Sequence, residues 1–299
     1  MKFYYLKLGK GNKHALDWLD KHDNPLKKPA IVIFFGRSTR ENLRTGESGQ
    51  QIRAFYESAD LANRSKRLLV VVGKGFVWIL QPNGDVIEAE DTDKLSEDDN
   101  LLKMMPVTVL ARKATKEVPH VLASINANAF LSRGTFREVT NWGNQKAICN
   151  VAGIDFPKDH WELGDCTAKQ LLECLSSVEL ETLVARVFEA AGCFVPAHRG
   201  GVMSDIDLFA HNDNSTEIRL NGLHIPAGKS VSIQVKGSNA PSDCPDEVDC
   251  LIAFDVERKS KCFDGEWLLK QVIKFPAVKT WLRRSLNWLP EKMLNPYGL

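Results

Sequence analysis

The sequence predicts an α/β domain in the C-terminal part of the chain, preceded by a strand-rich α+β N-terminal domain. A chain of 299 residues is longer than most single hydrophobic cores, so two domains are expected. Runs of β-branched and aromatic residues, separated by Gly, Pro and Asn-Gly, dominate the first half. After about residue 156, capped helical patterns are followed by several short apolar strands.

Four apolar runs of the N-terminal domain are expected to form strands. They cover residues 2–9, 30–36, 67–90 and 104–113. The third run is long enough for two strands, and the Pro-Asn-Gly turn at 82–84 is expected to join them as a hairpin. Short helices are expected over 12–22 and 50–63, and the acidic segment 90–100 is expected to be a loop.

The charge-rich segment 156–165 is the expected linker between domains at 1–155 and 166–299. Thr167 is expected to cap a short helix. In the next helix Ser176 and Glu179 fit a capping box, and Gly192 suits the position after its end. The remaining elements are expected strands at 193–196, 205–212, 231–237 and 248–257, and a Trp-rich helix at 277–293.

Composition indicates an ordinary soluble globular protein, with 43% hydrophobic and 26% charged residues. The net charge of +1 does not indicate a polyanionic partner, although basic residues cluster at 63–67 and 279–284. The seven cysteines form no C-x-x-C pair, which is typical of free thiols in a reducing compartment. With no signal-peptide pattern and no apolar run of membrane-spanning length, we expect a cytoplasmic protein with no membrane partner.

The strand 231–237 has an unusual polar face. Because side chains alternate along a strand, Val231, Ile233 and Val235 share one face, and Gln234 and Lys236 share the other. An edge strand with one solvated face is the simplest explanation. The alternative is that the polar face has a chemical role.

The preceding strand favours that alternative, because it places Asp205 and Asp207 together on one face. Burying unpaired carboxylates is costly, and a bound cation would offset the cost. The Asp207 carboxylate, the Gln234 amide oxygen and a strand carbonyl such as that of Val235 are the hard oxygen ligands that Mg²⁺ prefers. Lys236 would position or deprotonate an attacking water, or stabilise charge in a phosphoryl transition state.

These residues resemble the PD-(D/E)xK nuclease superfamily, and more closely its Mrr-like restriction endonuclease branch. In that branch a helix Glu, a G-x-D strand and a Q-x-K strand occur in this order, as do Glu181, Asp207 and the run 234–236 here. The resemblance covers about residues 170–275 and none of the N-terminal half. It implies a restriction-endonuclease-like domain with a central mixed sheet flanked by helices.

The resemblance also implies residue roles. Asp207 would be the essential metal ligand, Gln234 would stand in the place of an acidic ligand, and Lys236 would be the catalytic lysine. Glu181 would bind a second metal or orient a water. Asp205 is a weaker candidate ligand, for which a turn or cap residue is the alternative. Gln in place of an acid removes one negative charge, so metal affinity should be lower than at a fully acidic site.

One segment departs from the pattern of the branch. The insert 212–230 separates the two motif strands, and residues 217–228 within it are expected to form a protruding hairpin. Such a hairpin would either contact DNA or have no functional role.

The N-terminal half is similar to the PUA/EVE group of small barrels, some of which read modified bases. The similarity lies in the strand pattern and in the aromatic residues Phe34, Phe35, Phe76 and Trp78. No specific motif carries it, and a core role for these aromatics is the alternative. The stretch 132–139 offers Arg133 and Arg137 at helical spacing as a phosphate contact, or as an exposed basic turn.

Together these features predict an endonuclease of restriction or defence type that hydrolyses phosphodiester bonds in double-stranded DNA, with Mg²⁺ as cofactor and Mn²⁺ as substitute. Modified DNA is a candidate target. Cutting both strands requires two active sites, so a homodimer or a DNA-induced dimer is expected. Two alternatives stay open: a nuclease-fold DNA-binding module with weak catalysis, and a signal-gated nonspecific nuclease whose N-terminal domain binds a small nucleotide.

Overall fold

The computed structural model describes residues 1–43, 45–91, 101–127, 134–156, 166–196, 206–237, 241, 243–254, 256–259 and 261–299. The chain divides into two compact units, unit 1 (Met1–Pro157) and unit 2 (Lys158–Leu299). Both combine helices with a sheet, so the mixed α/β class is confirmed. Within the described ranges, no helix is both long and apolar enough to span a membrane.

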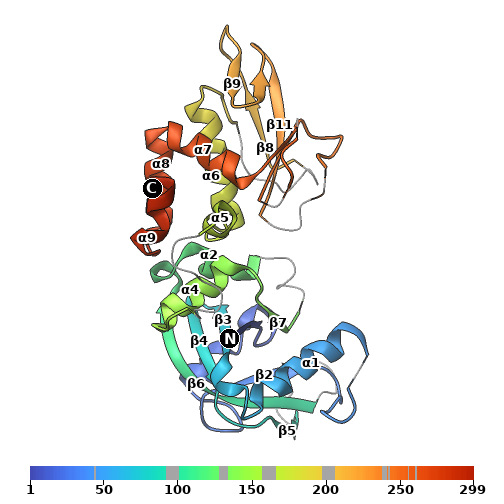
Figure 1. Cartoon of the computed structure of the whole chain (residues 1–299). Coiled ribbons are helices and arrows are strands. Elements are labelled where there is room, and N and C mark those ends of the chain that lie inside the picture. Colours follow the sequence, from blue (N-terminus) through green and yellow to red (C-terminus); the bar gives the residue numbers. More distant parts are fainter. Residues whose placement is uncertain are drawn as a thin grey trace. The chain divides into compact units, whose positions relative to one another are not determined.

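Unit 1 is built on a curled mixed sheet (Figure 1). Its strands are β1 (Lys2–Leu6), β2 (Ala30–Phe34), β3 (Arg67–Gly73), β4 (Phe76–Pro82), β5 (Ile87–Glu90), β6 (Leu101–Ala114) and β7 (Phe136–Glu138). They follow the order β2-β6-β4-β3-β1-β7, with β5 also paired to β6. β1 and β3 run parallel, and the other neighbouring pairs run antiparallel.

The helices of unit 1 are short, apart from two. They are η1 (Lys10–Asn12), the π-helical turn η2 (Leu16–Asp20), α1 (Gly46–Ala59), η3 (Arg64–Lys66), η4 (Thr115–Glu117), α2 (His120–Ala123), η5 (Ile125–Ala127) and α4 (Trp142–Ala152). α1 buries Phe55 in the core of the unit, where Phe55 contacts Phe136 edge to face. The helix expected over 50–63 therefore exists but begins and ends earlier.

The long apolar run at 67–90 forms three strands, so the prediction of two strands joined at 82–84 was wrong. The last pair between β3 and β4 is Gly73 with Phe76, and the turn between the two strands consists of Lys74 and Gly75. Both turn residues have positive φ, 51° and 81°, as the favoured two-residue hairpin turn requires. After Pro82 the chain leaves β4, and β5 pairs with β6 instead.

Unit 2 carries a second mixed sheet with helices packed against it. Its strands are β8 (Leu208–His211), β9 (Ile218–Leu220), β10 (Leu223–Ile225), β11 (Ser230–Lys236), β12 (Cys250–Ala253) and β13 (Cys262–Phe263). The main sheet has the order β13-β12-β11-β8, in which β11, β12 and β13 are parallel and β8 is antiparallel to β11.

The helices of unit 2 are α5 (Ala168–Leu172), α6 (Ser177–Ala190), α7 (Gly265–Lys274), α8 (Pro276–Ser285), α9 (Glu291–Leu294) and the final turn η7 (Asn295–Tyr297). α6 packs on β8 and β11, α7 packs on β12, and α8 packs on both helices. Figure 1 shows this order, with the sheet first, then α6 and α7, then α8. α6 therefore lies between the sheet and α8.

The caps predicted for the helices of unit 2 are confirmed. The Thr167 side chain accepts a hydrogen bond from the Gln170 N–H at the start of α5. At the start of α6, Ser176 accepts from the Glu179 N–H, and the Glu179 carboxylate accepts from the Ser176 N–H. These bonds satisfy donors that have no partner within the helix, which fixes where α6 begins.

Two other predicted elements were wrong. Residues 193–196 form no strand; Phe194 makes only an isolated bridge to His211. The helix expected over 277–293 is interrupted: α8 ends at Ser285 and α9 begins at Glu291, with Pro290 between them, which has no N–H to continue the helical hydrogen bonds. Glu90, the first residue of the expected acidic loop, ends β5. Residues 92–100 of that loop, residues 157–165 of the linker, Arg133 and Asp205 lie outside the described residues.

The insert between β8 and β11 contains the predicted hairpin, β9–β10, whose turn is Asn221-Gly222. Its tip is tied to the body of unit 2 and does not protrude freely. The Asn221 carbonyl accepts hydrogen bonds from the Trp267 indole N–H (3.1 Å) and from the Arg258 guanidinium (2.8 Å). At the base of the insert, the Asn212 side chain donates to the carbonyls of Thr216 and Ile225.

Candidate active site

The strand with the unusual polar face, β11, lies in the interior of its sheet. β12 pairs with it on one side and β8 on the other, so the explanation as a solvated edge strand was wrong. Gln234 is only 2% exposed. An amide side chain is therefore buried on an interior strand, and such strands are usually apolar.

Asp207 is anchored to β11 by two main-chain contacts. Its N–H donates to the Ile233 carbonyl at 2.9 Å, and its Oδ2 accepts from the Val235 N–H at 2.7 Å. These bonds flank Gln234 on both sides. The carboxylate thus holds a position at the end of β8 where a strand carbonyl would otherwise accept the Val235 N–H.

The contacts of Asp207 place it at the level of Gln234. β8 pairs Leu208 with Ile233, and Asp207 directly precedes this pair. The two bonds of Asp207 to β11 go to Ile233 and Val235, the residues on either side of Gln234. The Gln234 Oε1 is buried and has no hydrogen-bond partner among the described residues. A residue with a desolvated amide oxygen is therefore flanked by the contacts of a carboxylate-bearing residue.

Glu181 lies in α6, the helix that packs against β8 and β11. Burial and, to a smaller extent, the Asp207 carboxylate raise the pKa of the Glu181 carboxyl to about 7, against the opposing effect of Lys236. The three charged groups therefore interact electrostatically. With a pKa of about 7, the Glu181 carboxyl holds its proton through much of the range below neutral pH.

Lys236 is the last residue of β11 and is partly exposed. The residue that follows it, Gly237, lies against α6: a Cβ at that position would be 3.9 Å from Leu180 Cδ2. Since Leu180 directly precedes Glu181, the end of β11 and the Glu181 turn of α6 are neighbours. The structure therefore brings together Glu181, Asp207, Gln234 and Lys236, which are far apart in the sequence.

These residues offer a hard cation an unsatisfied oxygen ligand but few carboxylates. The unsatisfied Gln234 Oε1 is the kind of atom that a cation would satisfy. The residues that the structure describes contain no group of three or more His, Cys, Asp or Glu side chains able to hold a metal. A metal here would therefore depend on two carboxylates, one amide oxygen, the Val235 carbonyl and water, a set that suits Mg²⁺, which usually keeps several waters.

A further polar pair on the same face of β11 was missed by sequence reasoning. Ser232 donates its hydroxyl to Asp249 Oδ2 at 2.8 Å, and its main-chain N–H donates to the same oxygen at 2.9 Å. This pair ties β11 to the start of β12. The alternation that groups Gln234 with Lys236 also includes Ser232, and it was the signal for this contact.

The aromatic residues of unit 1 support the core interpretation. Trp78 is fully buried, and its indole N–H donates to Asp20 Oδ1 at 2.9 Å. Phe76 is covered by the guanidinium of Arg112 at 3.7 Å from the ring centre. Arg137 lies in β7, not in a helix, and its side chain pairs with Glu47.

Comparison with known proteins leaves the chain without an assigned family. No protein-family model matches it, and no curated protein or solved structure is significantly similar to it. The geometry and chemistry of the four side chains therefore carry the functional proposal.

Proposed function

We propose that this protein is a Mg²⁺-dependent DNA endonuclease of restriction or defence type whose active site consists of Glu181, Asp207, Gln234 and Lys236. The observation that carries the proposal is the buried Gln234 oxygen, which has no hydrogen-bond partner among the described residues, on an interior strand whose positions on either side of Gln234 both bond to Asp207. This arrangement supports the resemblance to the Mrr-like branch of the PD-(D/E)xK nucleases, in which a Q-x-K strand follows an acidic strand end.

The arrangement is unfavourable without a ligand, and this supports a functional role. An unsatisfied buried polar atom costs about 1–3 kcal/mol. Beside it, the repulsion between Asp207 and Glu181 disfavours ionisation of the Glu181 carboxyl. Both costs would fall if a cation bound between these groups. Clusters of groups with shifted pKa values and unsatisfied atoms are typical of functional sites.

Each side chain has a role that follows from its position. The Asp207 oxygen that does not accept the Val235 N–H, the Gln234 Oε1 and the Val235 carbonyl would hold the cation. Glu181 would bind a second cation or orient a water. When bound, Mg²⁺ would supply electrostatic stabilisation of negative charge on the phosphoryl oxygens.

Lys236 would act on the reacting phosphate itself. In phosphodiester hydrolysis a water oxygen forms a bond to phosphorus, one ester P–O bond breaks, the water loses a proton and the leaving alkoxide gains one. An ammonium at the end of β11 would hold the attacking water or stabilise the charge on the phosphoryl oxygens in the transition state. Since double-strand cleavage needs two such sites, we propose a homodimer or a DNA-induced dimer as the active form, with unit 1 as the part that recognises DNA.

The test is cleavage of modified and unmodified plasmids by purified protein with Mg²⁺, with Mn²⁺ and with EDTA. Cleavage that requires the metal and is lost in Lys236→Ala is the expected result. Matched controls are Lys229→Ala and Asp213→Ala, which remove the same kinds of charge from exposed positions of the same unit. Cleavage by Lys236→Ala at the wild-type rate would overturn the assignment of the site.

Two other results would favour the alternative functions. DNA binding without metal-dependent cleavage on any substrate would indicate a nuclease-fold binding module. Cleavage that appears only after addition of a small nucleotide would indicate a signal-gated nuclease.

A further inference from the structure

A second charged site lies in unit 2, in the groove between α8 and α9. The groove encloses about 350 Å³, and the buried side chains of Leu289 and Leu294 lie at its base. Its lining includes the cations Lys279, Arg283 and Arg284. These residues belong to one of the basic clusters of the sequence, and the fold gathers them along one helix.

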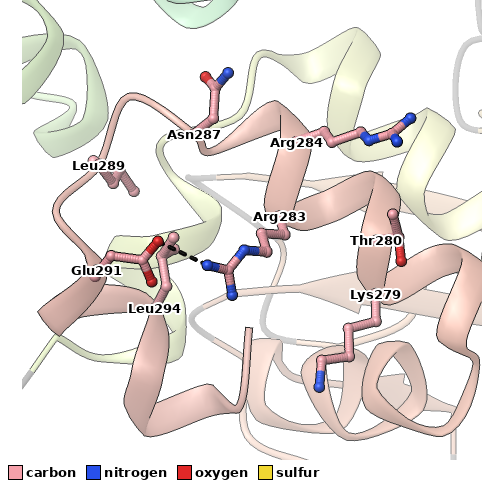
Figure 2. Close-up of a pocket in the computed structure, with 8 residues that line it drawn as sticks. All are labelled: Lys279, Thr280, Arg283, Arg284, Asn287, Leu289, Glu291 and Leu294. Atoms are coloured by element: carbon pink, nitrogen blue, oxygen red, sulfur yellow. Dashed lines mark hydrogen bonds and ion pairs between the residues drawn. The ribbon is translucent and has the colours of Figure 1, made fainter.

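The charges of the groove are only partly neutralised. Arg283 pairs with Glu291 of α9 at 2.7 Å, as Figure 2 shows, and both side chains are exposed. Within the described part of the chain, neither Lys279 nor Arg284 has an ion-pair partner. Arg284 points away from Glu291 at the rim of the groove (Figure 2). Lys279 and Arg283 therefore share the groove with one carboxylate, Glu291, and Arg284 adds a third positive charge at its rim.

The groove is separate from the candidate active site. α8 packs on α6 and α7, with Arg186 of α6 placed over the Trp281 ring at 5.3 Å, while the opposite side of α6 packs on β8 and β11. The cations of the groove are therefore not ligands or partners of Asp207 or Glu181, and they require an explanation of their own.

We infer that this groove binds the phosphate backbone of a nucleic acid. Lys279 and Arg283 lie on one side of α8, four residue steps apart, which is about 6 Å of helix. Phosphates of one DNA strand follow one another at about 3.4 Å along the duplex axis. Two separate cations at this spacing match phosphates along one strand better than a single small anion.

The rest of the lining agrees with backbone contact. Thr280 and Asn287 add neutral polar groups beside the cations, and no aromatic side chain lines the groove among the described residues. A nucleotide pocket would be expected to offer a surface on which a base can stack. The choice of DNA as the ligand rests on the proposed function, whereas the phosphate chemistry rests on the groove alone.

Glu291 gives the site a specific signature. An exposed ion pair of this kind contributes little to stability, so a phosphate can displace the carboxylate from Arg283. Removing the carboxylate in Glu291→Gln should therefore tighten DNA binding. A merely structural role for the Arg283–Glu291 pair predicts no such gain.

The experiment measures binding of a short fluorescein-labelled duplex by anisotropy, in EDTA, over a series of KCl concentrations. The slope of log K against log [KCl] reports the number of phosphate contacts, about 0.9 for each contact. The double variant Lys279→Gln with Arg283→Gln should lower the slope by about two and weaken binding about 60-fold at ~0.1 M salt, since each contact accounts for about eightfold there. The loss should be the same for different DNA sequences, because backbone contacts carry no sequence information.

The matched control is Lys229→Gln with Lys270→Gln, which removes the same charge from exposed positions outside the groove. An unchanged slope in the groove variant, an equal loss in the control, or a labelled mononucleotide that competes with the duplex for the groove would overturn the inference. Cleavage is scored separately with Mg²⁺. A reduced slope without any metal-dependent cleavage supports the groove and rejects the nuclease, and cleavage with an unchanged slope does the reverse.

Discussion

The main-chain N–H of Val235 donates to the Asp207 carboxylate at 2.7 Å, so that a residue proposed for metal binding also extends the hydrogen bonding of β11 beyond the start of β8. The Asp207 N–H in turn donates to the Ile233 carbonyl of β11. Asp207 therefore has a structural role in addition to the chemical one, which the sequence alone did not indicate. Substitutions at this position must separate the two roles.

Asp207→Asn keeps an oxygen that can accept the Val235 N–H but removes the charge. We expect this variant to fold with near wild-type stability and to lose metal-dependent cleavage. Asp207→Ala leaves the N–H unsatisfied and should cost about 1–3 kcal/mol of the free energy of unfolding as well. Urea unfolding of the two variants, beside the exposed control Asp213→Ala, measures the difference. Equal stability of the Asn and Ala variants would show that the bond from the Val235 N–H does not contribute to stability.

Glu181→Gln should change the pH dependence of stability in metal-free protein. An unfolded carboxyl loses its proton near pH 4.5, whereas the folded Glu181 keeps its proton up to about pH 7. Between these values the folded state holds more protons, so its stability falls as pH rises, and the loss is complete above about pH 7. The Gln variant should therefore match wild type at acidic pH and be more stable at pH 8.

Scanning calorimetry in EDTA at both pH values measures this difference. The transition of unit 2 should shift and that of unit 1 should not. A Gln variant less stable than wild type at pH 8 would contradict the proposed electrostatic cost at Glu181.

Substitution of Gln234 should separate metal affinity from stability. Gln234→Glu adds a carboxylate next to Asp207 and should tighten Mg²⁺ or Mn²⁺ binding, because charge strengthens a hard-cation site. Gln234→Leu removes the unsatisfied oxygen; it should abolish metal binding and be neutral or stabilising by about 1 kcal/mol without metal. Titration calorimetry and thermal unfolding measure the two effects. Weaker metal binding by the Glu variant would exclude Gln234 as a ligand.

The division of the chain into two units predicts that residues 166–299 fold in isolation. The fragment contains the sheet with β11 at its interior, the capped α6 and the helices that cover it. If unit 1 selects the DNA, the fragment should bind with strong salt dependence and little preference among substrates, because backbone phosphates carry no sequence information. Competition assays between modified and unmodified duplexes measure the preference. A fragment with the full substrate preference of the intact protein would show that unit 1 is not the reader.

Local signals predicted the elements that depend on neighbouring residues. The capping box of Ser176 and Glu179 located the start of α6, and alternation placed Gln234 and Lys236 on one face. The Asn221-Gly222 turn located the β9–β10 hairpin. In each case the deciding bonds join residues a few positions apart, or follow from the period of the strand.

Features that depend on distant partners were not accessible in this way. Whether β11 is an edge or interior strand is decided by its pairing with β12 and β8, and periodicity cannot reveal pairing partners. The bond from Val235 to Asp207 spans 28 positions. The groove of Lys279 and Arg283 requires α9 to fold back beside α8, and nothing in the basic cluster itself indicates that return.

The register of β8 and β11 has a consequence for engineering. His211 and Ser230 face each other at the ends of their strands, so the whole of 212–229 connects two residues that are already cross-strand partners. A two-residue Asn-Gly turn could join these partners directly. The shortened chain would keep Asp207 beside Gln234 and would lose the hydrogen bond between the Trp267 indole N–H and the Asn221 carbonyl. The insert also buries Leu220 and Ile225, so a protein without it would report what this small apolar cluster and the Asn221–Trp267 bond contribute to the stability of unit 2.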